Sequence, residues 1–145
     1  MKKLLFSIVA GLAALSLSAA ELEWHTDLAK AQAKAKAEKK LVLIDFTGSD
    51  WCGFCIKQQK EVFNTPEFAE YAKKNLILVE IDFPNKKEQS AEVKAANKKL
   101  KEEYAVRGFP TLVLLDSNGK KLGQEVGYGG GGPKAVIAKL EQLKG

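Results

Sequence analysis

The sequence predicts an α/β domain in which helices flank a central mixed sheet. Two short apolar runs, each followed by a helix-forming stretch, are typical of strand–helix–strand units. A third apolar run is followed by Asn118-Gly119, which is a strong signal for a hairpin and so for an antiparallel strand. Because 46% of the 145 residues are hydrophobic, the chain can bury a core, and global disorder is excluded.

The first twenty residues are not expected to belong to this domain. Met1–Lys3 is a short positive segment, Leu4–Leu17 is uncharged and apolar or small, and Ser18–Ala20 places small residues at a cleavage site. This pattern is typical of a cleaved secretory signal peptide at residues 1–20. The apolar run is short for a membrane span, and an uncleaved N-terminal anchor is the alternative. Cleavage would leave residues 21–145 as one domain without stable membrane insertion, in an oxidising periplasmic or extracellular compartment.

Charge and cysteine count narrow the classes of function. The 23 basic and 18 acidic residues give a net charge of +5, which falls to +3 without the first twenty residues. Such a small excess does not argue for a nucleic-acid partner. Two cysteines exclude a disulfide-rich scaffold, and with a single histidine they cannot fill a four-ligand zinc site. We therefore expect no metal and no bound cofactor.

A helix and a buried strand are predicted to open the domain. The segment Asp27–Lys40 is rich in Ala and Lys and lacks β-branched residues, which favours a helix capped by Thr26 or Asp27. The apolar run Leu41–Phe46, with one acid, has the length of a buried strand. The cluster Thr47–Asp50 is typical of a turn. His25, ahead of the helix, is expected to be an exposed bystander.

Two helices and a second strand are predicted next. Cys55–Phe63 is expected to be helical. Thr65-Pro66-Glu67 has the pattern of a cap with proline at the first helical position, and this helix should run to about Lys74. Leu76–Asp82 is a second apolar strand, and Pro84-Asn85 breaks the chain after it.

The segment Lys86–Tyr104 is predicted to form one long charged helix. Its charges should form a solvated face. Its apolar face is expected to consist of four residues: Ala91, Ala95, Leu100 and Tyr104. This helix is long for a domain of this size, and its length suggests no function.

A hairpin and a helix are predicted to close the domain. Thr111–Asp116 is a third strand, Ser117–Lys120 is the turn, and Lys121–Val126 is the returning strand. Gly127–Gly132 is expected to be a flexible loop, because it lacks the Lys-Ser/Thr pair of a nucleotide-binding loop. Lys134–Leu143 is amphipathic and should be the last helix.

The segment Trp51-Cys52-Gly53-Phe54-Cys55 is the one dense chemical motif. Its two cysteines, three residues apart at a helix start, are close enough to form a small disulfide ring. The unpaired N–H groups and the dipole of a helix start favour a thiolate at Cys52, and the thiolate is the nucleophile in disulfide exchange. Cys55, one turn further in, would be more buried. We therefore expect Cys52 to be the nucleophile and Cys55 to be the resolving thiol.

Other interpretations of the motif fit less well. Ile56 stands where a c-type haem site needs histidine, and a second Cys/His pair for a zinc ribbon is absent. A structural disulfide in a binding module remains an alternative, although so short a ring restrains little chain entropy. A metal chaperone using the two thiolates is a weaker one, because no Met or His lies within the loop.

The sequence resembles the thioredoxin superfamily. The resemblance covers about Asp27 to Leu143 and predicts a thioredoxin fold. It is carried by the acid-bearing strand, the cysteine motif and three downstream features: Val42–Phe46, Trp51–Cys55, Val106–Thr111, Asn118-Gly119 and Gly127. Asp45–Cys55 also resembles exported thioredoxin-like proteins. Glu61–Pro66 looks like the C-terminal thioredoxin domain of the membrane reductant transporter of the bacterial periplasm.

The resemblance implies roles for further residues. Pro110 corresponds to the cis-proline that faces the disulfide, and Phe109 would offer its backbone to an extended substrate. Trp51 would flank the nucleophile, and Gly53 and Phe54 would complete the substrate-contacting surface. Asp45 corresponds to the buried acid beneath the resolving cysteine, with a raised pKa that lets it accept or donate the Cys55 proton. One extra residue between Asp45 and Cys52 makes this alignment less direct.

The direction of electron flow is predicted from the surroundings of Cys52. Phe54 supplies no positive charge between the cysteines, and Asp50 opposes ionisation from two residues away. A weakly stabilised thiolate favours a reductase over a disulfide oxidase or isomerase. The expected partners are proteins with disulfides or dithiols and an upstream thiol reductant, either membrane-bound or soluble.

Overall fold

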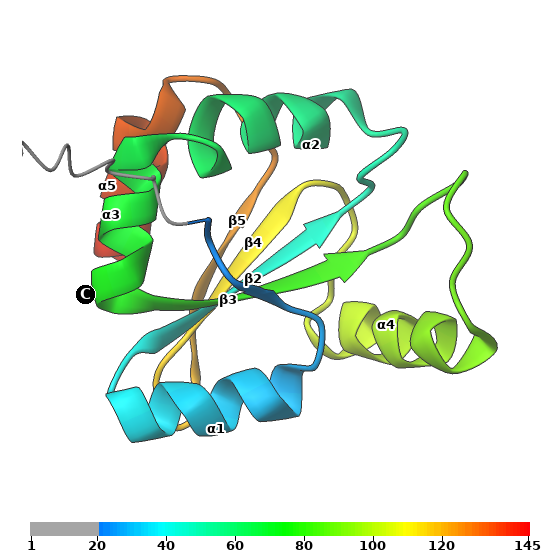
Figure 1. Ribbon diagram of the computed structural model, residues 1–145, viewed down its shortest axis with the longest axis horizontal. Coiled ribbons are helices and arrows are strands. Elements are labelled where there is room, and N and C mark those ends of the chain that lie inside the picture. Colours follow the sequence, from blue (N-terminus) through cyan, green and yellow to red (C-terminus); the bar gives the residue numbers. More distant parts are fainter. Residues whose placement is uncertain (1–20) are drawn as a thin grey trace, which may run out of the picture.

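The computed structural model describes residues 21–145, so the predicted signal peptide at residues 1–20 lies outside the described residues. Five strands form one mixed sheet with the order β1-β3-β2-β4-β5 (Figure 1). The strands are β1 (Trp24–His25), β2 (Leu41–Thr47), β3 (Leu76–Asp82), β4 (Thr111–Leu115) and β5 (Lys121–Val126). The strands β1, β3 and β2 are parallel, while β2–β4 and β4–β5 are antiparallel pairs. The predicted mixed sheet is thus confirmed.

Helices cover both faces of this sheet (Figure 1). They are α1 (Leu28–Glu38), α2 (Gly53–Gln58), α3 (Pro66–Asn75), α4 (Ala91–Glu103) and α5 (Gly132–Lys144), with a π-helical turn η1 (Gln59–Phe63) after α2. One buried cluster joins alternate residues of β2, β3 and β4 to η1, α3 and α5. The other joins the intervening strand residues to α1, with residues of α4 and the loop after it packed alongside. The sheet therefore lies between two helical layers, as in a thioredoxin fold.

The helix α1 shows how the sequence directs local packing. The Asp27 carboxylate caps it by accepting the Lys30 N–H at 3.1 Å, and Lys39 ends it in the left-handed region at φ 56°. Ala31 and Ala35, one turn apart, are fully buried. Small side chains at this spacing let the helix lie close to the sheet while its lysines stay in water. The predicted helix and its cap are confirmed.

The long helix predicted over Lys86–Tyr104 is wrong at its start. The helix α4 begins at Ala91, where the Ser90 hydroxyl caps it by accepting the Val93 N–H at 3.2 Å. Residues 84–90 form a loop instead. Pro84 disfavours a helix there, and the Asp50 carboxylate accepts backbone N–H groups of this segment.

The predicted apolar face of this helix is also partly wrong. Ala91 and Ala95 are exposed, while Leu100 packs against the core as expected. The buried position of α4 is Asn97, whose side-chain amide donates to the Asp82 carbonyl at 3.0 Å. A polar residue can be buried here because the end of β3 supplies a hydrogen-bond acceptor.

Smaller differences occur at the ends of the domain. The strand β1 was not predicted, and His25 within it is half-buried beside Val79 of β3, so its predicted exposure is wrong. The helix α5 begins at Gly132, and Gly130–Gly132 all have φ between 66° and 90°. The hairpin is confirmed, with Gly119 in the left-handed region at φ 87°. Among residues 21–145, no helix is long and apolar enough to cross a membrane.

Candidate active site

The two cysteines form a disulfide at the junction of β2 and α2. Their Cα atoms lie 5.2 Å apart, and Cys52 is the N-cap of α2. The helix begins at Gly53, two residues before the predicted start at Cys55. The Cys52 sulfur accepts the Cys55 N–H at 3.3 Å, and the Cys55 sulfur accepts the Gly48 N–H at 3.5 Å. Both residues are buried, with 7% and 4% of their surface exposed. Donors that face the sulfurs would stabilise a thiolate at either position.

Exposed aromatic side chains surround the disulfide. Trp51 is 45% exposed and Phe54 is 63% exposed, so neither is a core residue. The Trp51 indole is held in place because its Nε1–H donates to the Phe83 carbonyl at 2.7 Å. Gly53 begins α2, and a Cβ atom there would meet nothing within 4 Å. Large apolar groups in water beside a buried disulfide are suited to contact another chain.

The Phe109–Pro110 segment lies next to this surface. Its peptide bond is cis, which is the geometry that the resemblance implies. The Phe109 ring packs edge-on against Trp51, with centroids 5.9 Å apart, and against Phe83 at 5.2 Å. The Lys101 ammonium lies 5.4 Å from the Phe109 ring centre. Pro110 itself is buried, and its carbonyl accepts the Gly127 N–H at 2.7 Å.

Asp50 serves the loop after β3. Its carboxylate accepts backbone N–H groups from Asn85, Lys86 and Lys87 at 2.8, 2.7 and 3.0 Å. The hydrogen bond from Asn85 is the main reason that the pKa of Asp50 is lowered. The acid predicted to oppose Cys52 ionisation thus has its charge shared with three donors, and it joins the cysteine turn to the neighbouring loop.

Asp45 is buried in the middle of the sheet. It lies on β2 between Glu80 of β3 and Leu112 of β4, on the face that η1, α3 and α5 cover. Only 4% of its surface is exposed, and its Oδ1 has no hydrogen-bond partner. Burial raises the pKa of Asp45 to about 8, and the charges of Glu80 and Asp82 act in the same direction. The carboxyl group therefore holds a proton at neutral pH.

Glu80 and Asp82 were not identified as site residues from the sequence. Acids within an apolar strand do not reveal which residues of the folded protein lie opposite them. The Asp82 carboxylate accepts the Ser49 N–H at 2.9 Å and so fixes the turn before Cys52. Glu80 lines a hollow of about 220 Å³ together with Cys55. Burial raises the pKa of Glu80, Asp82 adds to this, and Lys87 opposes it.

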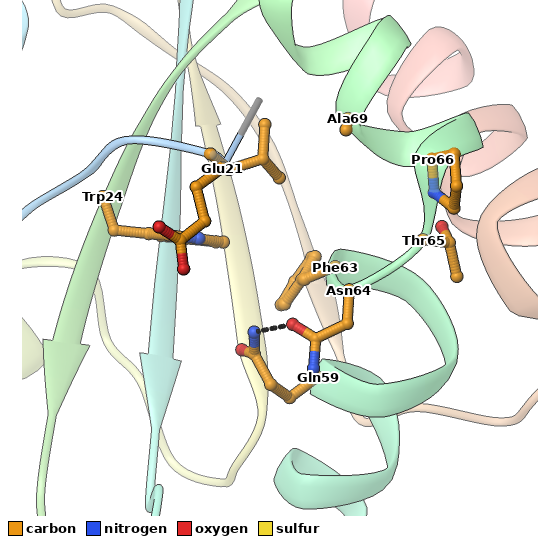
Figure 2. Close-up of a pocket in the computed structure, with 9 residues that line it drawn as sticks. Glu21, Trp24, Gln59, Phe63, Asn64, Thr65, Pro66 and Ala69 are labelled. Carbon is orange, nitrogen blue, oxygen red and sulfur yellow. Dashed lines mark hydrogen bonds between the residues drawn. The ribbon is translucent and has the colours of Figure 1, made fainter. Parts of the chain in front are cut away.

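A second hollow, of about 350 Å³, lies beside the first (Figure 2). Gln59 and Asn64 line both hollows, and the Gln59 Nε2 donates to the Asn64 Oδ1 at 2.9 Å. Figure 2 draws this side-chain pair, whose two residues belong to the lining of both the Cys55 hollow and the hollow lined by Trp24. Residues 21–145 contain no group of three or more His, Cys, Asp or Glu side chains placed to hold a metal ion.

Comparison with known proteins places the chain in a family. The model of the thioredoxin-like domain matches residues 28–144. The chain is 40% identical over 125 residues to the disulfide bond reductase DsbH of Chlamydia pneumoniae, covering 86% of this chain and 74% of that protein. It is 28% identical to the thioredoxin-related protein DsbJ of the same organism, and the match covers 97% of this chain. The chain spans less than half of DsbJ, 44% of its length.

A solved structure agrees with these matches. The structure titled DsbH oxidoreductase superposes with a TM-score of 0.79 at 35% sequence identity, covering 99% of this chain and 94% of that one. The agreement extends over the whole described domain, including the strands and helices that hold the two cysteines.

Proposed function

The chain belongs to the thioredoxin-like domain family and is a thiol–disulfide oxidoreductase, and from this premise we propose that it reduces disulfide bonds in other proteins. The observation that carries the proposal is the Cys52–Cys55 pair at the start of α2, bordered by the exposed rings of Trp51 and Phe54. A pair that cycles between dithiol and disulfide needs an exposed part and donors to its thiolate. Cys52 keeps 7% of its surface exposed, and an N–H group faces each sulfur.

The reaction uses the two cysteines in turn. In the reduced protein the Cys52 thiolate attacks a substrate disulfide, so that a mixed disulfide forms and one substrate sulfur leaves as a thiolate. The Cys55 sulfur then attacks Cys52, and the second substrate sulfur leaves with its electron pair. Cys55 suits the resolving role because its sulfur faces the Gly48 N–H beneath the surface. When a reductant later opens the Cys52–Cys55 disulfide, Cys55 leaves as a thiolate, and Asp45, which holds a proton at neutral pH, suits the role of its proton donor.

Substrate contact is assigned to the surface around Cys52. The rings of Trp51, Phe54 and Phe109 would pack against the residues that flank a substrate cysteine. Gly53 leaves room for the approaching chain, and the backbone at Phe109–Pro110 would pair with it as an added strand. Recognition through backbone and apolar contacts suits a protein that accepts several substrates.

The direction and the place of the reaction are further parts of the proposal. Phe54 supplies no positive charge to the Cys52 thiolate, which favours a reducing disulfide. The printed name of the relative, disulfide bond reductase, points the same way. We place the protein outside the cytoplasm, because the pattern of residues 1–20 is that of a secretory signal peptide. An oxidising compartment requires an upstream thiol reductant, membrane-bound or soluble, to regenerate the dithiol.

Insulin reduction in the presence of dithiothreitol tests the proposal. Protein comprising residues 21–145 should accelerate insulin precipitation, Cys52→Ser should abolish the activity, and Cys55→Ser should accumulate mixed disulfides. Equal inactivity of the wild type and both variants would overturn the proposed activity. A reduction potential close to that of thioredoxin would support the proposal that the protein reduces its substrates. A potential of about −120 mV, the value of a strong oxidant, would overturn it.

A further inference from the structure

Glu80 occupies a position that the mechanism above does not use. It lies on β3, directly beside Asp45 in the parallel register of β2 and β3, so the two side chains are on the same face of the sheet. It is half-buried, whereas Asp45 is almost fully buried. A carboxyl group in this position has access both to the solvent and to the space beneath the cysteines.

The space that Glu80 shares with Cys55 is a partly open hollow. It has a volume of about 220 Å³, which is room for several water molecules. Thr47, Ser49, Gln59 and Asn64 also line it, and their polar groups can hold water in place. Asp45 does not line this hollow, so Glu80 is its one carboxyl group.

The proton of Cys55 needs an acceptor before this sulfur can attack. Asp45 is poorly suited to accept it at neutral pH, because burial and two neighbouring acids leave this group already protonated. Burial and Asp82 raise the pKa of Glu80 as well, but this carboxyl group is less buried than Asp45, and the positive charge of Lys87 favours its ionised form. The charged or titratable groups around Glu80 are Asp45, Cys55, Lys60, Asp82, Lys87 and Glu88.

We propose that Glu80 accepts the Cys55 proton through water in this hollow during the resolving step. The Cys55 S–H bond breaks, and its proton passes through water to the Glu80 carboxylate. The Cys55 sulfur then forms its bond to Cys52 while the bond between Cys52 and the substrate sulfur breaks. The substrate leaves as a thiolate with that electron pair, and Glu80 returns its proton to the solvent. This inference rests on the proposed function, because it concerns the second half of the same exchange.

Ellman's reagent separates the two halves of the reaction. When the reduced protein meets a limiting amount of this aromatic disulfide, Cys52 releases one coloured thiolate and the attack of Cys55 releases the second. With Glu80→Gln, the first phase should be unchanged, and the second should slow by about tenfold at neutral pH. Added formate, a small carboxylate that fits the hollow, should restore the second phase, and Glu80→Asp should keep part of its rate.

The sign of the change distinguishes this role from a purely electrostatic one. If Glu80 only raised the pKa of Asp45, its removal would lower that pKa and make the second phase faster at neutral pH. A faster or unchanged second phase, or a slower one that formate does not restore, overturns the inference. Glu125→Gln is the matched control, because Glu125 is a half-buried acid on β5 that pairs with Lys139 at 3.7 Å. A wild type that releases no thiolate would contradict the proposed function instead.

Discussion

The replacement Asp45→Asn should make the protein's stability less dependent on pH. Folding raises the pKa of this group from 3.8 to about 8, so the folded state binds more protons than the unfolded state between these values. The free energy of unfolding therefore falls as the pH rises through this window. Each pKa unit corresponds to about 1.4 kcal/mol, so the full shift corresponds to about 6 kcal/mol. Water entry around the ionised group reduces this, and we expect a loss of about 2–4 kcal/mol.

Urea unfolding of the oxidised protein measures this effect. Wild type and Asp45→Asn are compared at several values from about pH 5 to about pH 9, with the exposed acid Glu88 replaced by Gln as the control. The difference between wild type and Asp45→Asn should shift in favour of the variant as the pH rises, and Glu88→Gln should follow the wild type. Parallel curves for wild type and Asp45→Asn would refute the burial argument.

Three further replacements test individual contacts. Gly48→Ala should displace the Trp51 indole and slow insulin reduction several-fold, because the added methyl would lie 2.7 Å from its Nε1; unaltered near-ultraviolet circular dichroism would contradict this. Asp50→Ala should speed amide hydrogen exchange in the loop after β3 by about tenfold, since three N–H groups lose their acceptor; unchanged exchange there would argue against it. Asn97→Ala should lower the free energy of unfolding in urea by about 1 kcal/mol, because a buried hydrogen bond to the Asp82 carbonyl is lost, and an equally stable variant would count against the contact.

The fold and the cysteine pair could be predicted because local patterns determine them. Asn118-Gly119 demands a turn with a left-handed residue, and Gly119 adopts it. The position of Cys52 at a helix start follows from the turn residues that precede it and the helix-forming residues that follow it. These features depend on residues that are close together in the sequence, so local sequence patterns are enough to predict them.

Features that depend on distant partners could not be predicted. Glu80 faces the space below Cys55 only because β3 pairs with β2 in one particular register, which no local pattern specifies. Asn97 is buried because a carbonyl at the end of β3 meets its amide, whereas periodicity marked Ala91 and Ala95 as the inner face. Asp50 looked like a modifier of Cys52, but its main contacts are with a loop 35 residues further on.

The shortness of β1 has a consequence for association between chains. It pairs with β3 only at Leu78 and Val79. Among the described residues, no strand pairs with the side of β3 that faces away from β2 at Glu80 and Asp82. A free strand edge is a template on which other extended chains assemble, and acidic side chains beside it discourage such growth. We therefore expect the acidic end of β3 to limit assembly of chains at this edge, where the Gln89 and Asn97 side chains already donate to the Asp82 carbonyl.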